Sequence, residues 1–240
     1  MIKKTIMKKE IQLHPSQANI LKVLLLKPEA RFRDLNKLGL STDHFSFHIK
    51  SLIDSGLVVK SGYFYNLTVV GKEFANRLDI EKQAPQIEKQ AKVGVLIFAV
   101  KNFSGVKKYL LQQRLKQPYF GYFGGVGGKL KVGETLFEGA EREFSEETGL
   151  SAKLSFAGVN HKMDYSKDGI LLEDKLFFVF RADNPQGELV KEFPGGKNFW
   201  FSLVEIRKLP KLFPDVLDKL KMIEAKNISF SEKKYFVDEF

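Results

Sequence analysis

The sequence contains no cysteine among its 240 residues. Disulfide bonds, thiolate metal sites and cysteine nucleophiles are therefore excluded, and any bound metal must use oxygen or nitrogen ligands. The chain also lacks a run approaching the roughly 20 apolar residues of a membrane span, and its basic first residues lead into no apolar signal segment. We therefore expect a cytoplasmic protein with no membrane partner.

Proline is sparse, with 8 residues, whereas phenylalanine is abundant, with 22. The hydrophobic content of 43% is sufficient for well-packed cores, which argues against a disordered chain. The length favours one large or two modest domains. Because residues 80–92 are polar and lack a continuous apolar face, we predict a first domain over 1–82, a linker over 83–91 and a second domain over 92–240.

Acidic residues are outnumbered by basic ones, 29 to 39, which gives a net charge of +10. Residues 1–91 hold 15 basic and 9 acidic side chains, a net of +6, and residues 92–240 hold 24 and 20, a net of +4. DNA-binding and phosphate-handling proteins are both typically basic, and a lysine-rich source organism would give the same excess. Charge alone leaves all three explanations open.

The first domain has the pattern of three short helices followed by a hairpin. Helices are expected over 16–26, 31–38 and 42–56, with Ser16 and Thr42 as N-caps. Two β-rich runs, 57–60 and 63–68, are separated by two residues, a spacing that favours a tight turn, and a helix over 71–78 follows. This order resembles the winged helix-turn-helix superfamily over roughly residues 14–80, which implies DNA binding.

The third helix would carry the surface that reads DNA. Its apolar residues from Phe45 to Ile53 repeat at helical spacing and are expected in the core, so that the opposite face can enter the major groove. This face and the wing supply the candidate DNA contacts Ser46, Phe47, Lys50 and Lys60. The face also carries Asp43, which phosphate repels. A partner protein or a second copy of the chain, as a homodimer, therefore stays open beside double-stranded DNA.

One segment of the second domain has a pattern that chance rarely produces. Residues 128–150 read GKLKVGETLFEGAEREFSEETGL. The pattern G-x5-E-x7-R-E-U-x-E-E-x-G-U, where U is a bulky apolar residue, is matched at every fixed position: Gly128, Glu134, Arg142, Glu143, Phe144, Glu146, Glu147, Gly149 and Leu150. The segment therefore resembles the signature of the Nudix hydrolase family. The resemblance implies an α/β/α sandwich with a mixed sheet, and with the winged helix an α/β (α+β) chain.

The chemistry of the signature can be derived from its residue types. Thr135 and Glu138 form a capping box, and Gly149 is a glycine stop, which predicts a helix of about 13 residues between them. Three glutamates fall within an arc of roughly 100° on this helix: Glu143, Glu146 and Glu147. Neighbouring carboxylates repel one another, and the helix dipole disfavours them at a C-terminal end. Bound Mg²⁺ or Mn²⁺ removes this conflict and bridges substrate phosphates.

The signature and its flanks indicate roles for further residues. Arg142 lies four positions before Glu146 and can hold that carboxylate, which leaves Glu143 and Glu147 to the metal. In Nudix hydrolases a backbone carbonyl from the glycine before the signature commonly joins the glutamates, which here is Gly127. An upstream strand at Tyr109–Gln113 and the glycine-rich approach to the signature supply the candidate substrate-binding residues Arg114, Gly128 and Lys129.

A further acidic residue on a downstream loop often serves as a base or an extra ligand in this family. Glu192, in KEFPGGKNFWF, is our candidate, and Glu188, Glu173 and Asp174 are the alternatives because the sequence does not fix the loop. The predicted catalytic residues are therefore Arg142, Glu143, Glu146, Glu147 and Glu192. The predicted metal ligands are Glu143, Glu146, Glu147 and Gly127.

The functional prediction is Mg- or Mn-dependent hydrolysis of the pyrophosphate bond in a nucleoside diphosphate linked to another moiety. Val126 stands where most family members carry proline, a variant reminiscent of purine-triphosphate sanitising members. The alternative is a nucleotide-sensing transcriptional regulator, in which the second domain senses the ligand and the winged helix responds at DNA. Residues 226–240 are expected to add a strand or to pack across domains.

Overall fold

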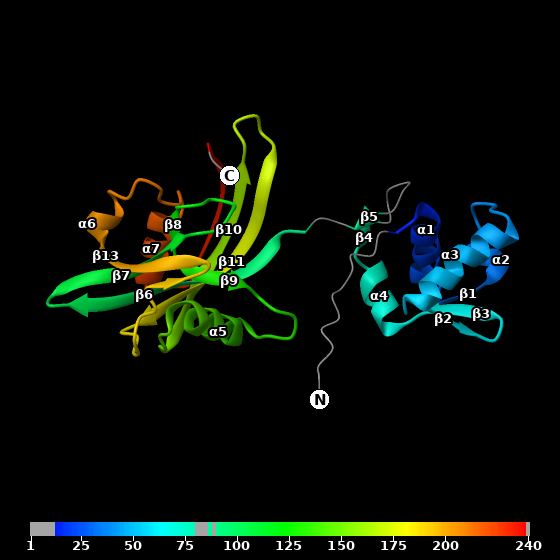
Figure 1. Cartoon of the computed structure of the whole chain (residues 1–240), viewed down its shortest axis with the longest axis horizontal. Coiled ribbons are helices and arrows are strands. Elements are labelled where there is room, and N and C mark those ends of the chain that lie inside the picture. Colours follow the sequence, from blue (N-terminus) through cyan, green and yellow to red (C-terminus); the bar gives the residue numbers. More distant parts are fainter. Residues whose placement is uncertain (1–12, 80–85, 88–89, 239–240) are drawn as a thin grey trace. The chain divides into compact units, whose positions relative to one another are not determined.

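The computed structural model describes residues 13–79, 86–87 and 90–238, and the chain divides into two compact units, residues 1–89 and 90–240 (Figure 1). Most of the predicted linker, 83–91, lies outside the described residues. Within it, β5 (Gln86–Ile87) pairs with β4 (Leu78–Asp79), so this segment contributes a short strand to a hairpin. No helix of the described part is both long and apolar enough to cross a bilayer.

The first unit combines helices with a three-stranded sheet. Its elements before β4 are, in order, α1 (Pro15–Leu26), β1 (Glu29–Arg31), α2 (Phe32–Leu35), α3 (Thr42–Asp54), β2 (Val58–Ser61), β3 (Phe64–Leu67) and α4 (Val69–Ala75). The strands lie in the order β1-β3-β2 and all pairs are antiparallel. This arrangement is compatible with a winged helix, as the sequence predicts.

Two helix caps in the first unit differ from the prediction. The N-cap of α1 is His14, whose Nδ1 accepts a hydrogen bond from the Ser16 N–H at 3.2 Å, so Ser16 lies inside the helix and is buried. The N-cap of α3 is Ser41, in place of Thr42, and its hydroxyl accepts a hydrogen bond from the His44 N–H at 3.4 Å. In both cases the cap lies before the predicted residue.

Helix α2 is shorter than predicted and ends at Leu35. The Asn36 side chain donates to the Leu40 carbonyl at 2.7 Å and accepts from the Leu40 N–H at 3.0 Å. These local bonds compete with helix continuation, because they satisfy the backbone without the next helical turn. Helix α4 starts earlier than predicted, because Thr68 caps it.

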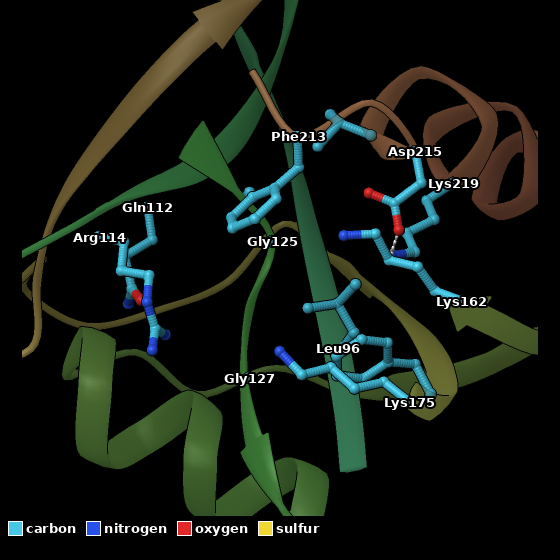
Figure 2. Close-up of a pocket in the computed structure, with 13 residues that line it drawn as sticks. Leu96, Gln112, Arg114, Gly125, Gly127, Lys162, Lys175, Phe213, Asp215 and Lys219 are labelled. Carbon is cyan, nitrogen blue, oxygen red and sulfur yellow. Dashed lines mark hydrogen bonds and ion pairs between the residues drawn. The ribbon is translucent and has the colours of Figure 1, made fainter. Parts of the chain in front are cut away.

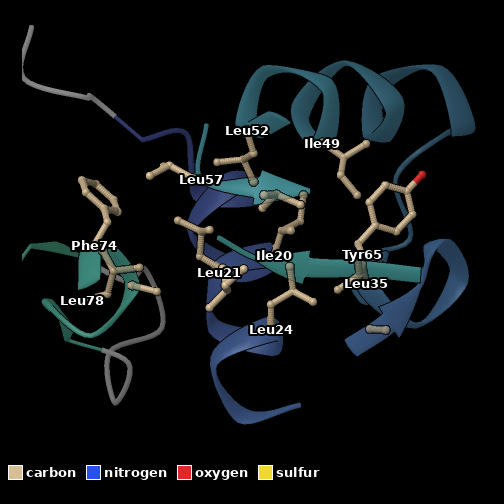
Figure 3. Packing of buried hydrophobic residues seen from close by; sticks show 14 of the residues in the cluster. Ile20, Leu21, Leu24, Leu35, Ile49, Leu52, Leu57, Tyr65, Phe74 and Leu78 are labelled. Atoms are coloured by element: carbon tan, nitrogen blue, oxygen red, sulfur yellow. The ribbon is translucent and has the colours of Figure 1, made fainter. Parts of the chain in front are cut away.

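One apolar core holds the first unit together (Figure 3). It gathers residues from α1, α3, the hairpin and α4: Ile20, Leu21, Leu24, Phe45, Ile49, Leu52, Leu57 and Phe74. The inward stripe predicted on α3 is therefore confirmed. Burial of these side chains fixes which face of α3 remains outside.

The second unit is built on a nine-stranded mixed sheet. Seven strands follow the order β12-β13-β7-β6-β11-β10-β14, and in addition β8 pairs with β7 and β9 pairs with β6. The strands are β6 (Lys92–Phe103), β7 (Val106–Arg114), β8 (Phe123–Gly124), β9 (Val126–Lys129), β10 (Leu154–Tyr165), β11 (Leu171–Asp183), β12 (Glu192–Phe193), β13 (Gly196–Ser202) and β14 (Ser229–Phe236). Two pairs, β6–β11 and β10–β14, are parallel. Strand β14 confirms the strand expected within residues 226–240.

Helices cover both faces of this sheet (Figure 1). The helix α5 (Leu136–Thr148) packs over a core that includes Ile97, Phe144 and Phe180. The opposite face is covered by α6 (Leu203–Ile206) and α7 (Val216–Glu224), with a second core around Phe98 and Leu220. The expected α/β/α sandwich with a mixed sheet is therefore confirmed.

The edge strand β14 is joined to the sheet by an ionic cluster at His161 on β10. The two imidazole nitrogens lie 2.6 Å from the Glu232 carboxylate on β14 and 2.8 Å from the Asp174 carboxylate on β11. Hydrogen bonds to Glu232, and then to Asp174, raise the pKa of His161 above its usual value. The imidazole ring therefore ties three strands together.

We expect His161→Gln to destabilise the protein more at pH 5.5 than at pH 9. Because folding raises the His161 pKa, its contribution is fully present below the unfolded pKa of about 6.5 and is lost as the pH rises through the folded value. The cluster is partly exposed, so the effect is about 1 kcal/mol or less, or about 2 to 4 °C in Tm. Thermal melts at both pH values test this, and equal losses would contradict it.

Candidate active site

Helix α5 begins and ends where the sequence predicts. The Thr135 hydroxyl accepts from the Glu138 N–H at 3.3 Å, and the Glu138 carboxylate accepts from the Thr135 N–H at 2.8 Å, which completes the capping box. Gly149 ends the helix with φ of +70°, a conformation that favours glycine. Ala140 and Phe144 are buried against the sheet and fix the rotation of the helix.

Arg142 is the centre of an ionic network on this helix. Its guanidinium donates to the Glu134 carboxylate at 2.6 and 2.9 Å, to Glu143 at 2.7 Å and to Glu146 at 3.2 Å. Hydrogen bonds from Arg142 lower the pKa of Glu134 to about 2. The predicted Arg142–Glu146 contact is present, but Arg142 also holds Glu143, which the prediction left free. Arg142 thus anchors the loop before α5 and orients two of its glutamates.

Glu147 faces a different environment, on the side of α5 towards β7. Its carboxylate accepts a hydrogen bond from Gln112 Nε2 at 3.0 Å. Burial raises the pKa of Glu147, and the nearby Glu143 charge raises it further, against the lowering effect of Gln112 and Lys116. A partly buried carboxylate beside a second negative charge is a group that a cation would stabilise.

The glycines before the signature are required by packing. A Cβ on Gly128 would lie 2.4 Å from the carboxylate carbon of Glu143, and one on Gly127 would lie 2.2 Å from the Val95 carbonyl oxygen. Gly124 and Gly125 are similarly closed off by the rings of Phe213 and Phe98. The loop therefore needs glycine to lie against β6 and against the Glu143 carboxylate.

Among the described residues, Glu143, Glu146 and Glu147 do not form a preorganised metal-binding group, and their joint role as metal ligands stays a prediction. Residues 13–79, 86–87 and 90–238 contain no group of three acidic or histidine side chains placed to hold a metal ion. The reason is that Glu146 is drawn towards Arg142 and its side chain is 57% exposed, whereas that of Glu143 is only 12% exposed. The donors that fit a divalent cation are Glu143 and Glu147, with the Gly127 carbonyl as the third that the family resemblance implies.

Glu192 lies on the β12–β13 hairpin, where its carboxylate pairs with Lys197 at 3.1 Å and is 60% exposed. In the same hairpin, the Asn198 side chain donates to the Glu147 carbonyl at 2.8 Å. The hairpin is thus tied to the C-terminal end of α5, although no described contact joins the Glu192 side chain to an α5 glutamate. Its role as a base stays a prediction.

A cavity of about 100 Å³ adjoins this end of α5 (Figure 2). Strand β6 pairs with β9 through residues 94–97 and with β7 through residues 100–103, and the cavity lies where β7 and β9 diverge. Gln112 and Gly127 belong to its wall and also contact Glu147. The cavity and Glu147 are therefore neighbours that share two contact residues.

Cationic side chains dominate this wall: Arg114, Lys162, Lys175 and Lys219, with Asp215 as the one carboxylate among the lining residues. Figure 2 shows the ammonium groups of Lys162 and Lys175 directed into the space between α7 and the glycine-rich loop. Arg114, predicted to bind substrate, thus lies at the cavity. Lys129, also predicted to bind substrate, is exposed, and its backbone carbonyl accepts from Arg142 at 3.3 Å.

Several residues of this site were not predicted from the sequence. Gln112 and Asn198 contact Glu147 from β7 and β13, but a single amide in a strand carries no recognisable signal. Lys162 and Lys175 were missed because a lysine in a strand normally faces solvent. A signal was present for Lys162, since it alternates with Asn160 and Asp164 on one face of β10, and all three are buried.

We expect Gln112→Leu to lower kcat/KM roughly tenfold with little change in Tm, because partners that orient a metal ligand typically contribute 10- to 100-fold. Gln113→Leu is the matched control, since this neighbouring side chain donates to the Gly121 carbonyl at 3.4 Å and has no described hydrogen bond to Glu147. Steady-state kinetics on both variants decide the matter. An equal loss in the two would show that Gln112 acts through strand packing.

The residues of the predicted DNA face lie on α3 and on the β2–β3 hairpin of the first unit. Phe47 is 69% exposed, Lys50 and Lys60 are exposed, and Ser46 is half-buried. The Lys60 ammonium lies 5.6 Å from the Tyr65 ring centre. The outward face thus carries one large aromatic ring, separated cations and the exposed carboxylate of Asp43.

Comparison with known proteins places these features in a family. A family model described as NUDIX domain matches residues 89–225, more than half of the chain. The ADP-ribose pyrophosphatase of Methanocaldococcus jannaschii is 31% identical over 157 residues, 63% of this chain and 85% of that protein. An uncharacterized Nudix hydrolase of Bacillus subtilis, YvcI, is 33% identical over 97 residues, 40% of this chain and 61% of that protein.

The oxidized purine nucleoside triphosphate hydrolase of Danio rerio is 37% identical over 68 residues, 28% of this chain and 42% of that protein. The chain thus spans less than two thirds of the Bacillus and Danio relatives. Among solved structures, the NUDIX domain of Shewanella oneidensis NrtR, complexed with ADP ribose, is 18% identical with a TM-score of 0.48, over 56% of this chain and 87% of that domain. From the family match and the complete signature, we conclude that the chain belongs to the NUDIX domain family.

Proposed function

We propose that the second unit hydrolyses the pyrophosphate bond of a nucleoside diphosphate linked to another moiety, with Mg²⁺ or Mn²⁺. The observation that carries this proposal is the position of Glu147, a partly buried carboxylate that lies beside the Glu143 charge and contacts two residues of the wall of a cationic cavity. A bound divalent ion would neutralise charge on the phosphate oxygens during displacement. The names of the Methanocaldococcus and Danio relatives support a phosphoanhydride substrate.

Two residues orient the metal-binding carboxylates, and a third carboxylate accepts the proton of the attacking water. Arg142 holds the Glu143 carboxylate, and Gln112 holds that of Glu147, so that both are oriented before substrate binds. Attack of water on phosphorus breaks the bridging P–O bond, and a carboxylate must accept the water proton. We assign the role of proton acceptor to Glu192, because Asn198 ties the hairpin that carries Glu192 to Glu147.

A substrate panel tests this function. Purified protein is incubated with Mg²⁺ or Mn²⁺ and ADP-ribose, dinucleotide polyphosphates, nucleotide sugars or oxidised dNTPs, and the products are identified by mass. We expect cleavage within the phosphoanhydride of at least one compound and no turnover after the metal is removed with a chelator. Absence of turnover on every compound with both metals would contradict the proposal.

A second proposal concerns the first unit, which we infer binds double-stranded DNA in response to a nucleotide held by the second unit. The exposed Phe47 and Lys50 on α3, in a unit compatible with a winged helix, support it. Gel-shift assays on genomic fragments, with and without ADP-ribose, test it. Absence of sequence preference at moderate salt would leave a partner protein or a second copy of the chain as the ligand.

For this DNA complex, we expect Lys50→Ala to reduce the slope of log Kd against log salt by about one, because one phosphate contact is lost. Lys72→Ala is the control, since Lys72 is exposed on α4. Salt titrations of the parent and both variants measure the slope. An unchanged slope for Lys50→Ala would remove α3 from the DNA interface.

A further inference from the structure

The cationic cavity beside Glu147 contains more positive charge than its own carboxylates neutralise. Lys162 pairs with Asp164 at 2.8 Å, and Lys219 pairs with Asp215. Glu173 is shared by two cations, Lys175 and Lys92. Arg114 donates to the Pro118 and Gln117 carbonyls, at 2.5 and 3.1 Å, and is ion-paired with no carboxylate of the described residues. Lys92 lies outside the wall, so the four cations of the wall face three carboxylates, an excess of one, and Glu147, whose charge also acts on Arg114, adjoins the cavity.

Two of these cations are held away from water, which makes them costly without a ligand. The side chains of Lys162 and Lys219 are 5% and 3% exposed. Burial lowers the pKa of Lys175 and of Lys219, as expected for ammonium groups in an apolar setting. Apolar side chains of similar volume would fill this space at lower cost. An anion that enters the cavity would recover the charge balance.

Aromatic rings surround two of the ammonium groups of the cavity. The Lys162 ammonium lies 4.9 Å from the Phe213 ring centre and 5.4 Å from that of Tyr119. The Lys219 ammonium lies 4.9 Å from the ring centre of Phe177. Ring faces stabilise ammonium groups but offer no acceptor that competes with an incoming phosphate or carboxylate. The Lys162 ammonium is thus positioned by Asp164 and the rings and directed into the cavity (Figure 2).

We propose that this cavity is a subsite for an anionic group, a phosphate or a carboxylate, carried by the moiety that the substrate's diphosphate links to the nucleoside. The proposal rests on the function proposed above. Because Gln112 and Gly127 belong both to the cavity wall and to the surroundings of Glu147, a group adjoining the diphosphate reaches the cavity. Lys162, Lys175 and Arg114 then determine specificity for substrates with a charge beyond the diphosphate.

Two matched substrate pairs test the subsite. UDP-glucuronate differs from UDP-glucose by a carboxylate in place of a hydroxymethyl group, and ADP-ribose 1″-phosphate differs from ADP-ribose by one phosphate. We expect the anionic member of at least one pair to have a kcat/KM at least tenfold higher. The two pairs distinguish a carboxylate from a phosphate. Equal values within both pairs, or a preference for the neutral members, would overturn the proposal.

Lysine variants test whether Lys175 causes the preference for the anionic substrate. Lys175→Gln should reduce the preference for the anionic member to below threefold, and Lys175→Arg, which keeps the charge, should retain it. Lys153→Gln, an exposed lysine before β10, is the control and should match the parent. A preference that persists in Lys175→Gln, in protein whose Tm shows that it is folded, would contradict the assignment of this residue and of the cavity.

Binding measurements test the subsite independently of catalytic turnover. The Glu147→Gln variant is titrated by calorimetry with the same four compounds in Mg²⁺, and tighter binding of the anionic member supports the subsite whether or not the parent protein hydrolyses either compound. If the parent hydrolyses none of them while this binding preference is present, only the proposed hydrolysis of these compounds fails. If none of the four binds, or if the members of each pair bind equally, the subsite fails.

Discussion

Glu147→Gln is expected to lower kcat/KM by about 10³-fold while leaving the fold intact. The substitution keeps the volume and the contact with Gln112 but removes the charge of a partly buried carboxylate. A divalent cation contributes several kcal/mol of charge stabilisation in phosphoryl displacement, and each 1.36 kcal/mol corresponds to a factor of ten. Kinetics on the substrate identified by the panel, with circular dichroism as the fold check, measure the effect.

Two glutamates on the same helix serve as controls. Glu141→Gln removes a charge from an exposed position of α5 and should leave kcat/KM within about twofold, since an exposed charge has little effect. Glu146→Gln should have a smaller effect than Glu147→Gln, because the Glu146 carboxylate is paired with Arg142 and its side chain is 57% exposed. Full activity of Glu147→Gln would show that the metal site is misassigned.

Gly128→Ala is expected to cost about 100-fold in kcat/KM with only a small change in Tm. The added methyl would lie 2.4 Å from the Glu143 carboxylate carbon, so this side chain must move. A displacement of about 1 Å in a reacting arrangement costs on the order of 10²-fold. Because the displaced atoms belong to the end of a side chain, the sheet itself need not shift. The affinity for Mn²⁺ should fall together with the activity.

Gly127→Ala is expected to lower Tm, whereas Gly128→Ala is expected mainly to lower activity. The two variants together therefore distinguish an effect on chemistry from an effect on folding. There the methyl would lie 2.2 Å from the Val95 carbonyl oxygen, which belongs to the central strand β6 and cannot rotate away. Overpacking of this kind lowers the free energy of unfolding by about 1 to 3 kcal/mol, which corresponds to several degrees in Tm. If Gly128→Ala instead unfolds the protein and Gly127→Ala does not, the roles given to the two glycines are wrong.

The sequence predicts those parts of the fold that depend on local chemistry. The capping box at Thr135 and the stop at Gly149 determine α5 to the residue, because both act within one turn of the helix. The caps of α1 and α3 were misplaced, because His14 can accept a backbone hydrogen bond although histidine is rarely chosen as a cap, and because Ser41 precedes a second hydroxyl residue.

The candidate site is predicted only where it lies within one segment. Arg142, Glu143 and Glu147 come from one helix, so their spacing alone places them together. Gln112 and Lys162 reach the same region from separate strands, and their approach depends on sheet order and on the divergence of β7 and β9 from β6. No periodicity in a single strand encodes such long-range pairing. The contacts of Arg142 with Glu134 and Glu143 were missed, because spacing along the helix does not show that one guanidinium binds several carboxylates at once.

The most direct test of the central claim is a titration of the protein with Mn²⁺, followed by the paramagnetic resonance signal of the free ion. The proposed function predicts one Mn²⁺ site in the parent and in Glu141→Gln, with affinity reduced at least tenfold in Glu147→Gln. Equal binding of Mn²⁺ by all three proteins, or no binding by the parent with or without a nucleotide diphosphate, would contradict the assignment of Glu143 and Glu147 as the metal-binding carboxylates.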